Sequence, residues 1–274
     1  TSIGMLTLKN RIVRSATNEH LSETDGQVTR AWADALIELA AHEVGLVISG
    51  HFCVDASQRA DEGQPVLDEK TDREILRYAA DGVHQYGSKV LIQLSHSGIK
   101  AMERVNGAAA KHPEDFSLSE LDRLVERFVY AAECCKVCGF DGVQIHTAHG
   151  YLLSNFLNPS ENRRTDAYGG SLENRFRLIA RILSAVRAAC GDDFAVLVKA
   201  DCNGCGDFPA LLKLYEGCGV DAVEVSGVDF NHRAGQKTPF YAQALLQGSN
   251  CVSLPVFPVG GVFSRQTAEE LLRQ

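Results

Sequence analysis

The sequence lacks the long apolar runs that carry a chain across a membrane. No hydrophobic stretch approaches the roughly 20 residues of a membrane-spanning helix. Residues 1–9 also lack the charged start and apolar core of a signal peptide. We therefore expect a cytoplasmic protein with no membrane association. Because the first residue is Thr1 rather than methionine, we also expect that residues are missing before it.

The sequence has no excess of basic residues. Its 27 Lys and Arg are outnumbered by 35 Asp and Glu, which gives a formal net charge of −8. Nucleic-acid binding depends on Lys and Arg contacts to phosphates, so this balance disfavours DNA or RNA as a partner. We expect a small-molecule substrate instead, and the sequence leaves the formation of a homo-oligomer open.

The cysteines show no sign of a disulfide framework. Nine of them are scattered along the chain, and the odd number without a secretion signal predicts reduced thiols. Cys202 and Cys205 have the CxxC spacing of a redox pair or half a metal site, but no second CxxC accompanies them. We expect no metal, and we expect Cys134, Cys135 and Cys138 to be packing residues.

Seven apolar, β-branched runs alternate with amphipathic helical stretches. Unbroken apolar runs are typical of strands buried on both faces of a parallel sheet. Two of the helical stretches, residues 31–42 and 121–138, show the i, i+3, i+4 spacing of a helix with one buried face. The predicted strands are residues 11–16, 45–49, 89–94, 142–146, 194–199, 222–225 and 256–259.

This alternation predicts an α/β protein with a (β/α)8 TIM barrel. The doubly wound alternative needs a Gly-rich phosphate loop after the first strand, where residues 15–20 read Ser-Ala-Thr-Asn-Glu-His. The sequence ends in the helix after the seventh strand, so the eighth βα unit is missing. No low-complexity linker divides it. We expect residues 1–274 to form one barrel domain that is truncated or incomplete at its C-terminus.

Polar residues follow the predicted strands. In a barrel of this kind, side chains at the C-terminal ends of the strands form the active site. Here these positions hold many hydrogen-bond donors and few acids, which suits an electron-rich, anionic ligand better than a divalent metal. In chain order they are Asn18, His20, Gly50, His51, Gln93, His96, His146, His149, Tyr151, Lys199, Asp201, Ser226, Gly260 and Gly261.

The strongest local signal is residues 146–151, His-Thr-Ala-His-Gly-Tyr, which directly follow a strand. Two imidazoles can hydrogen-bond a carbonyl or phenolate oxygen and stabilise charge that grows on it. A tyrosine can protonate a carbon as a general acid. The other interpretations are a metal site, histidines that only pack or cap, and a tyrosine that belongs to the core.

Three further positions indicate ligand contacts. Gln93 lies within a buried strand, so its amide needs partners, either a planar cofactor edge or neighbouring backbone. Lys199 ends an apolar strand, and its ammonium needs an anion, either on a ligand or on a neighbouring acid such as Asp201. Gly260 and Gly261 would let backbone N–H groups approach a phosphate, and a tight turn explains them equally well.

Together these residues resemble the old yellow enzyme family of FMN-dependent NAD(P)H oxidoreductases. The likeness begins at residues 8–13, LKNRIV, and continues through residues 93–98, QLSHSG. It is most specific over residues 139–177, GFDGVQIHTAHGYLLSNFLNPSENRRTDAYGGSLENRFR, and it covers nearly the whole chain.

The resemblance implies roles for individual residues. Tyr151 would donate a proton to a carbon of the substrate, while His146 and His149 would bind the substrate's activating oxygen. Residues 157–159 and 163–164 would support the loop that frames the site. The residues implied to contact FMN are Ala16, Thr17, Asn18, Gly50, Gln93, His146, Lys199, Gly260 and Gly261.

The implied activity passes hydride from NADH or NADPH, through FMN, to an activated alkene such as an enone or enal. Two departures from the family stand out. The Gly-Arg pair of the last strand, which contacts the phosphate, is absent, and Ile99-Lys100 stands where Arg is more common. The alternatives are a non-redox barrel lyase that uses Lys199 as a Schiff base and a non-catalytic barrel that has lost FMN.

Overall fold

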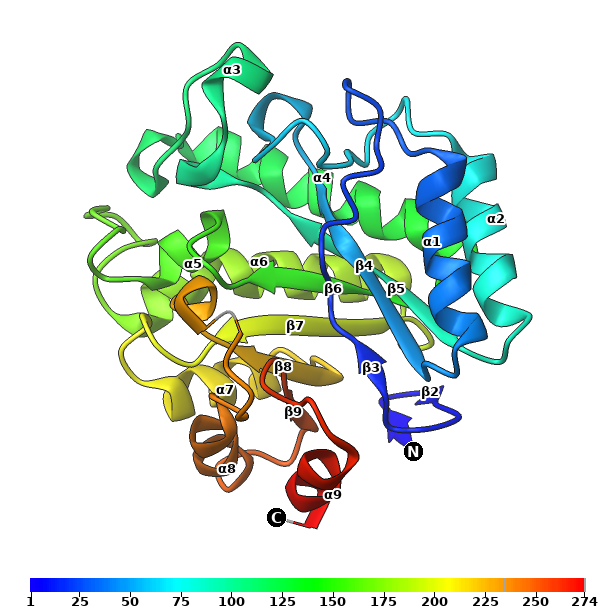
Figure 1. Ribbon diagram of the computed structural model, residues 1–274. Helices are drawn as coiled ribbons and strands as arrows, with labels where there is room; N and C mark the ends of the chain where they lie inside the picture. The colour runs from blue at the N-terminus through cyan, green and yellow to red at the C-terminus, as the bar shows by residue number, and fades with distance from the viewer. Residues whose placement is uncertain (234, 274) are drawn as a thin grey trace.

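A computed structural model describes residues 1–233 and 235–273, and its centre is one curled parallel sheet (Figure 1). Seven strands follow one another in the order of the sequence, each hydrogen-bonded to the next. All seven predicted strands are therefore confirmed. They are β3 (Val13–Arg14), β4 (Leu46–Cys53), β5 (Lys89–Ser95), β6 (Gly142–Thr147), β7 (Ala195–Asp201), β8 (Ala222–Ser226) and β9 (Val256–Pro258).

The sheet is open between its first and last strands. Within the described ranges β3 pairs only with β4 and β9 only with β8, so the edges of β3 and β9 are not joined by a backbone ladder. The predicted α/β class and parallel curled sheet are confirmed. The predicted absence of an eighth βα unit stays a prediction.

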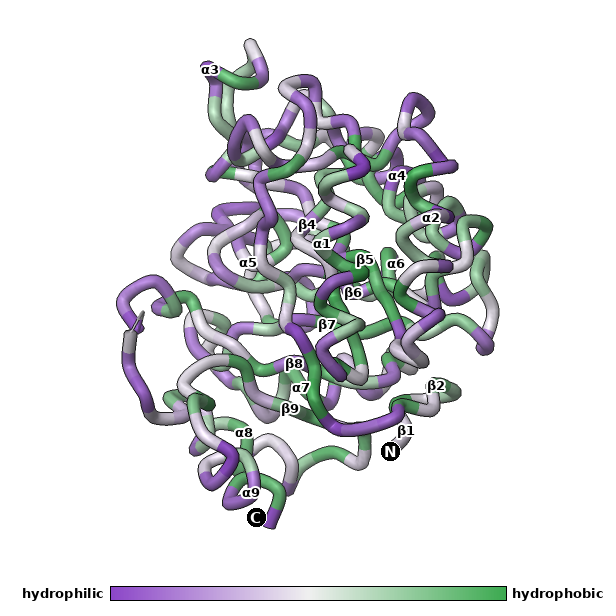
Figure 2. The backbone as a smooth tube through the Cα atoms, turned by 45° about the vertical axis from the view of Figure 1, so that its right-hand side comes forward, coloured by the Kyte–Doolittle hydropathy of each residue, from purple (hydrophilic) through white to green (hydrophobic). Residues whose placement is uncertain are grey.

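Helices cover the outer face of the sheet (Figure 1). The tube view shows the apolar strand segments enclosed by helices and loops that are largely polar on the outside (Figure 2). None of the helices in the described part of the chain is both long and apolar enough to span a bilayer. The helices are α1 (Arg30–Ala41), α2 (Arg73–His84), α3 (Glu103–Asn106), α4 (Leu118–Val137), α5 (Leu152–Leu157), α6 (Leu172–Cys190), α7 (Phe208–Gly217), α8 (Ala242–Ser249) and α9 (Arg265–Arg273).

The two predicted helices are α1 and α4, and α4 begins three residues earlier than the apolar periodicity indicates. A capping box explains the earlier start. The Ser117 hydroxyl accepts the N–H of Glu120 at 3.3 Å, and the Glu120 carboxylate accepts the N–H of Ser117 at 2.8 Å. The predicted packing role of Cys134, Cys135 and Cys138 is confirmed, because all three lie buried in the core beside α4.

Two similar junctions set the register of neighbouring strands. After α4, Gly139 takes a left-handed backbone (φ +90°) and Asp141 accepts the N–H of Val90 at 2.9 Å. After α7, Gly219 (φ +69°) precedes an aspartate, Asp221, that accepts the N–H of Val196 at 2.8 Å. Each aspartate therefore anchors the incoming strand to the start of the strand beside it.

An N-terminal hairpin that the periodicity did not predict covers one end of the sheet. Strands β1 (Ser2–Ile3) and β2 (Leu6–Thr7) pair antiparallel, and Ile3, Leu6 and Leu8 pack in one apolar cluster with residues from the beginnings of the central strands. Because the N-terminal end of the sheet is filled in this way, a ligand site is left to the opposite end, where the strands finish.

Candidate active site

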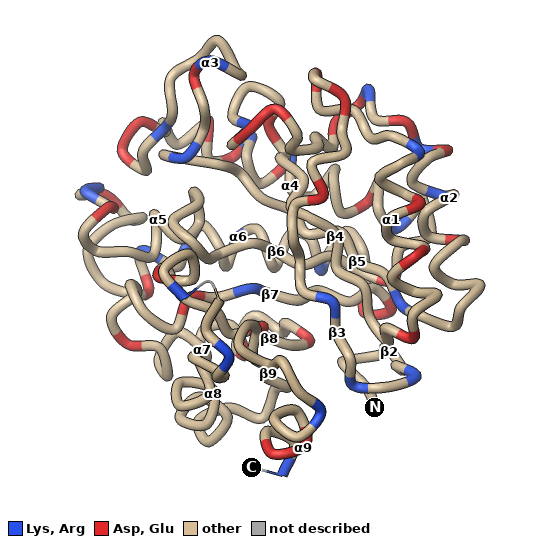
Figure 3. The backbone as a smooth tube through the Cα atoms, viewed as in Figure 1, with Lys and Arg blue, Asp and Glu red and all other residues tan. Residues whose placement is uncertain are grey.

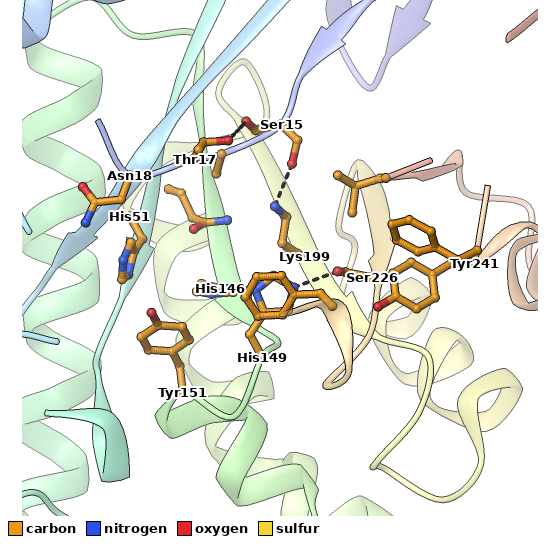
Figure 4. A pocket seen from close by; sticks show the side chains of 16 residues that line it. Ser15, Thr17, Asn18, His51, His146, His149, Tyr151, Lys199, Ser226 and Tyr241 are labelled. Atoms are coloured by element: carbon orange, nitrogen blue, oxygen red, sulfur yellow. Dashed lines mark hydrogen bonds between the residues drawn. The ribbon is translucent and has the colours of Figure 1, made fainter. Parts of the chain in front are cut away.

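A cavity of about 350 Å³ opens at the C-terminal ends of the strands (Figure 4). Its size lies within the range of small-molecule and cofactor sites. No Asp or Glu is among its described lining residues. Acidic and basic residues are interspersed along the backbone as a whole (Figure 3). The lining residues are Ser15, Ala16, Thr17, Asn18, His51, Gln93, His146, His149, Tyr151, Lys199, Ser226, Phe230, Phe240, Tyr241, Val259 and Gly260.

The structure brings most of the predicted site residues to this one cavity. Gln93, Lys199 and the pair His146 and His149 come from different strands and line the same space. Of the residues implied to contact substrate or FMN, two do not line it. Gly50 packs behind the segment that follows β3, and Gly261 lies in an adjoining groove.

Gly50 acts through backbone packing. It lies at an irregularity in the pairing of β4 with β5, between Ile48 and His51. A Cβ placed on Gly50 would stand 2.8 Å from both the carbonyl oxygen of Thr17 and the Cα of Asn18. Its N–H is accepted by the Glu19 carboxylate at 3.1 Å. Glycine at this position therefore lets β4 hold the cavity-lining segment of residues 16–18.

We predict that Gly50→Ala displaces this segment and weakens FMN binding by about tenfold, because the added methyl would overlap backbone atoms of Thr17 and Asn18. Gly217→Ala is the matched control, since a Cβ at Gly217 meets no heavy atom within 4 Å. Fluorescence titration with FMN measures both variants. Equal affinity for FMN in the two variants would contradict this role for Gly50.

Gly261 lines a groove of about 290 Å³ between β3 and β9, which shares Ser15, Val259 and Gly260 with the cavity. A Cβ at Gly261 would lie 1.8 Å from the carbonyl oxygen of Thr238, so glycine permits the close approach of that chain segment. No Lys or Arg is among the described residues that line this groove. A phosphate there would depend on backbone N–H groups.

His146, His149 and Tyr151 form one wall of the cavity (Figure 4). The ring centre of His146 lies 5.1 Å from that of His149 and 4.9 Å from that of Tyr151. Burial lowers the pKa of both histidines well below the usual value, and the nearby Lys199 ammonium acts in the same direction. Both imidazoles are therefore neutral at pH 7, and each can donate one N–H.

The two imidazoles have different partners. His149 Nε2 is 2.7 Å from the Ser226 hydroxyl, and its ring stacks on Phe230 with centres 3.9 Å apart. His146 Nδ1 is buried and has no hydrogen-bond partner in the described structure. The protein therefore fixes the ring of His149 through a hydrogen bond to Ser226 and leaves His146 Nδ1 without one.

Tyr151 is held between two basic side chains. The His51 ring centre is 4.9 Å from that of Tyr151, and Lys100 Nζ lies 5.0 Å from the centre of the Tyr151 ring. Burial raises the pKa of Tyr151 to about 12, so the phenol keeps its proton throughout the neutral range. Burial also lowers the pKa of His51 to about 4, which leaves this third imidazole neutral.

A chain of hydrogen bonds runs beneath the cavity. Gln93 Nε2 donates to Gln144 Oε1 at 2.7 Å, and Gln144 Nε2 donates to Glu224 Oε2 at 2.8 Å. Lys199 Nζ lies 3.4 Å from the same carboxylate oxygen and donates to the Ser15 hydroxyl at 2.8 Å. The sequence left open an ion pair of Lys199 with a neighbouring acid such as Asp201; the structure forms an ion pair of this kind, and the acid is Glu224, not Asp201.

The ionised Glu224 sets the direction of this chain. A carboxylate only accepts hydrogen bonds, so Gln144 must turn its NH₂ toward Glu224 and its oxygen toward Gln93. Gln93 must then use its own NH₂ on Gln144. Its Oε1 makes no hydrogen bond to any described residue, and Gln93 lines the cavity. Gln93 thus offers an acceptor to a ligand, while Lys199 offers a positive charge.

Some lining residues had no predicted role. The sequence placed His51 and Ser226 among the strand-end positions without assigning either one a contact to substrate or FMN, and both line the cavity. Phe230, Phe240 and Tyr241 come from the long connection after β8, where no sequence pattern indicated a site. Of the other strand-end histidines, His20 is exposed and pairs with Asp61, and His96 packs against Phe116 outside this cavity.

The CxxC pair shows no feature of a reactive dithiol. All nine cysteines are free thiols. Burial raises the pKa of Cys202 to about 11 and that of Cys205 to about 11, so neither is a ready thiolate near neutral pH.

Comparison with protein families gives one long match. Residues 1–201 match the sequence model of the NADH:flavin oxidoreductase / NADH oxidase family. An NADPH dehydrogenase from Bacillus licheniformis is 32% identical over 296 residues, which cover 99% of this chain and 85% of that protein. An NADH oxidase from Thermoanaerobacter brockii is 27% identical over 302 residues, which cover 99% of this chain and 46% of that protein. The chain thus spans most of one relative and about half of the other.

Comparison with solved structures identifies the same architecture. An old yellow enzyme homologue from Zymomonas mobilis superposes with a TM-score of 0.84 and 23% identity, covering 100% of this chain and 84% of that chain. At this identity the likeness shows the fold: a curled parallel α/β sheet of the kind found in that barrel.

Proposed function

The chain belongs to the NADH:flavin oxidoreductase / NADH oxidase family, and we propose that it reduces an activated alkene, such as an enone or enal, with hydride from NADH or NADPH. The predicted resemblance to old yellow enzymes is confirmed, and with it the NAD(P)H-dependent flavin oxidoreductase class and FMN as cofactor. The substrate and the roles of individual residues are the proposal. We also propose that residues 1–274 form a single barrel domain.

The cavity suits the ring system of FMN. Gln93 Oε1 is an unpaired acceptor, Lys199 carries a positive charge, and no carboxylate lines the space. These are the groups that complement a flat ligand with an N–H edge and a site where negative charge accumulates. We propose that Ala16, Thr17 and Asn18 pack along one side of the ring. Gly260 and Gly261 would present backbone N–H groups to the phosphate.

FMN held in this cavity would supply the hydride-transfer chemistry that links the nicotinamide to the alkene. The protein positions the alkene and supplies the proton. His146 and His149 hold the substrate's carbonyl oxygen through their N–H groups and stabilise the charge that develops there. Tyr151, 4.9 Å from His146 between ring centres, gives the phenolic proton to the carbon next to that carbonyl.

The observation that carries this proposal is the convergence of two walls on one cavity: a neutral imidazole pair with a protonated phenol faces Gln93 and Lys199. A lyase that uses Lys199 as a Schiff base fits less well. Such a lysine must turn its Nζ to the substrate carbonyl carbon, whereas Lys199 Nζ is tied to the Ser15 hydroxyl at 2.8 Å and to the Glu224 carboxylate at 3.4 Å.

The test is a spectral titration of the FMN-loaded protein without oxygen. We expect the absorbance of oxidised flavin to disappear on addition of NADH or NADPH and to return when cyclohexenone is added. Bleaching without recovery by any enone or enal would reject alkene reduction while leaving the flavin oxidoreductase class intact. Absence of saturable FMN binding would instead favour the alternative of a barrel without cofactor.

A further inference from the structure

Asp201, at the end of β7, carries one further inference. We propose that it is a positioning residue that holds the His149–Tyr151 loop in the conformation needed for alkene reduction. This inference rests on the proposed function and deepens it, because Asp201 does not line the cavity and acts only through its neighbours.

The loop that Asp201 holds has an unusual backbone. His149 (φ +65°) and Gly150 (φ +71°) are consecutive residues in the left-handed region. That conformation is unfavourable for a side chain such as histidine, and it persists only where surrounding contacts enforce it. It turns the chain sharply between β6 and α5, so that His149 and Tyr151 both face the cavity.

Asp201 supplies those contacts. Its Oδ2 accepts the N–H of His149 at 2.8 Å and the hydroxyl of Ser154 at 2.8 Å. The same hydroxyl accepts the N–H of Gly150 at 3.1 Å. The two N–H groups of the left-handed pair are thus tied to one carboxylate oxygen, directly and through Ser154.

The carboxylate is held at a cost to stability. Asp201 is only 4% exposed, and its Oδ1 is buried with no partner in the described structure. Burial raises the pKa of Asp201 to about 7, against the opposing effect of the Ser154 and His149 hydrogen bonds. The charged groups that face it are Lys100 and Asp229, and the titratable groups packed around it are His149, Cys202, Cys205 and Tyr215.

The sign of the pH effect follows from this raised pKa. Between about pH 4 and pH 7 the unfolded chain has lost the Asp201 proton while the folded protein retains it, so this group makes folding less favourable as pH rises. The anion that appears above about pH 7 accepts the hydrogen bonds of His149 and Ser154 more strongly than the neutral acid does. Asp201 therefore favours the working loop conformation above pH 7 and lowers stability in the same range.

The experiment compares Asp201→Asn with Asp141→Asn in the FMN-loaded protein. Asp141 is a partly buried carboxylate that also accepts a backbone N–H, pairs with His84 and Lys89, and lies at the opposite end of the sheet. The measurements are the rates of both half-reactions from pH 5.5 to 9, the thermal midpoint at pH 8, and amide hydrogen exchange of peptides that cover residues 147–157.

We expect the wild-type rate of enone reduction to rise between pH 6 and 8. Asp201→Asn should flatten that rise and slow enone reduction about tenfold at pH 8. It should leave flavin reduction by NAD(P)H unchanged, raise the thermal midpoint at pH 8, and speed exchange in residues 147–157. Asp141→Asn should lower the thermal midpoint and keep the wild-type pH profile.

Two results would overturn the inference. The first is an unaltered pH profile in Asp201→Asn. The second is equal slowing of both half-reactions together with a lower thermal midpoint, because that is the result expected of a purely structural residue. The exchange measurement needs no substrate. If the wild type proves unable to reduce any alkene, unchanged exchange of residues 147–157 in Asp201→Asn still counts against the positioning role, and faster exchange still supports it.

Discussion

Tyr151→Phe should slow enone reduction by about 10²- to 10⁴-fold and leave flavin reduction by NAD(P)H within about twofold of the wild type. The phenol is the proton source proposed for the substrate carbon, and phenylalanine keeps the ring packing against His51 and His146 while removing the proton. Stopped-flow absorbance of the flavin separates the two half-reactions, because reduction bleaches the band and the enone restores it.

The pH dependence of enone reduction provides a second test of the role of Tyr151. Burial raises the pKa of Tyr151 to about 12, so the wild type should show no loss of enone reduction from ionisation of this phenol up to about pH 10. His51→Phe is a control that changes a ring neighbour of Tyr151 without removing the phenol. Equal slowing of both half-reactions in Tyr151→Phe would show that the tyrosine supports the site and does not donate the proton.

Lys199→Met should lower the free energy of unfolding by about 3–5 kcal/mol, because it leaves the buried Glu224 carboxylate without its positive partner. Glu224 would keep the Gln144 hydrogen bond, which alone does not offset the burial of a charge. Urea denaturation followed by circular dichroism measures the change.

A double variant, Lys199→Met with Glu224→Gln, should recover most of the lost stability, since no charge then remains buried at this point. It should still bind FMN more weakly than the wild type, because the positive charge proposed to face the flavin is gone. If the double variant were as unstable as Lys199→Met, the loss would come from packing of the lysine stem and the ion-pair explanation would be wrong.

The sequence predicted the sheet well because the signal for each strand, a run of apolar residues, lies within the strand itself. Seven unbroken apolar runs correspond to seven neighbouring parallel strands, because a strand that is buried on both faces carries apolar side chains on both of them. The hairpin β1–β2 escaped prediction because four paired residues are too short for any periodicity. The early start of α4 depends on the capping box of Ser117 and Glu120, which apolar spacing does not report.

The site was predictable where it lies at strand ends and not where it depends on long-range pairing. Gln93, His146 and Lys199 follow from their positions in buried strands. Glu224 was missed as the partner of Lys199 because only the curl of the sheet decides which inward-facing side chains meet across it. Likewise Phe230 reaches His149 from a long connection whose path carries no repeating pattern.

The bond between Lys199 and Ser15 joins residues 184 positions apart, from the middle of the sheet to its first edge. Contacts of such wide sequence separation close a large loop of chain, which makes them among the last to form as a protein folds. β3 contributes only two residue pairs to the ladder with β4, so the contact from Lys199 adds to the few bonds by which β4 holds the segment after β3. During synthesis on the ribosome, the cavity is therefore completed only after β9 and Gly260 have emerged, and capture of the cofactor follows assembly of the sheet.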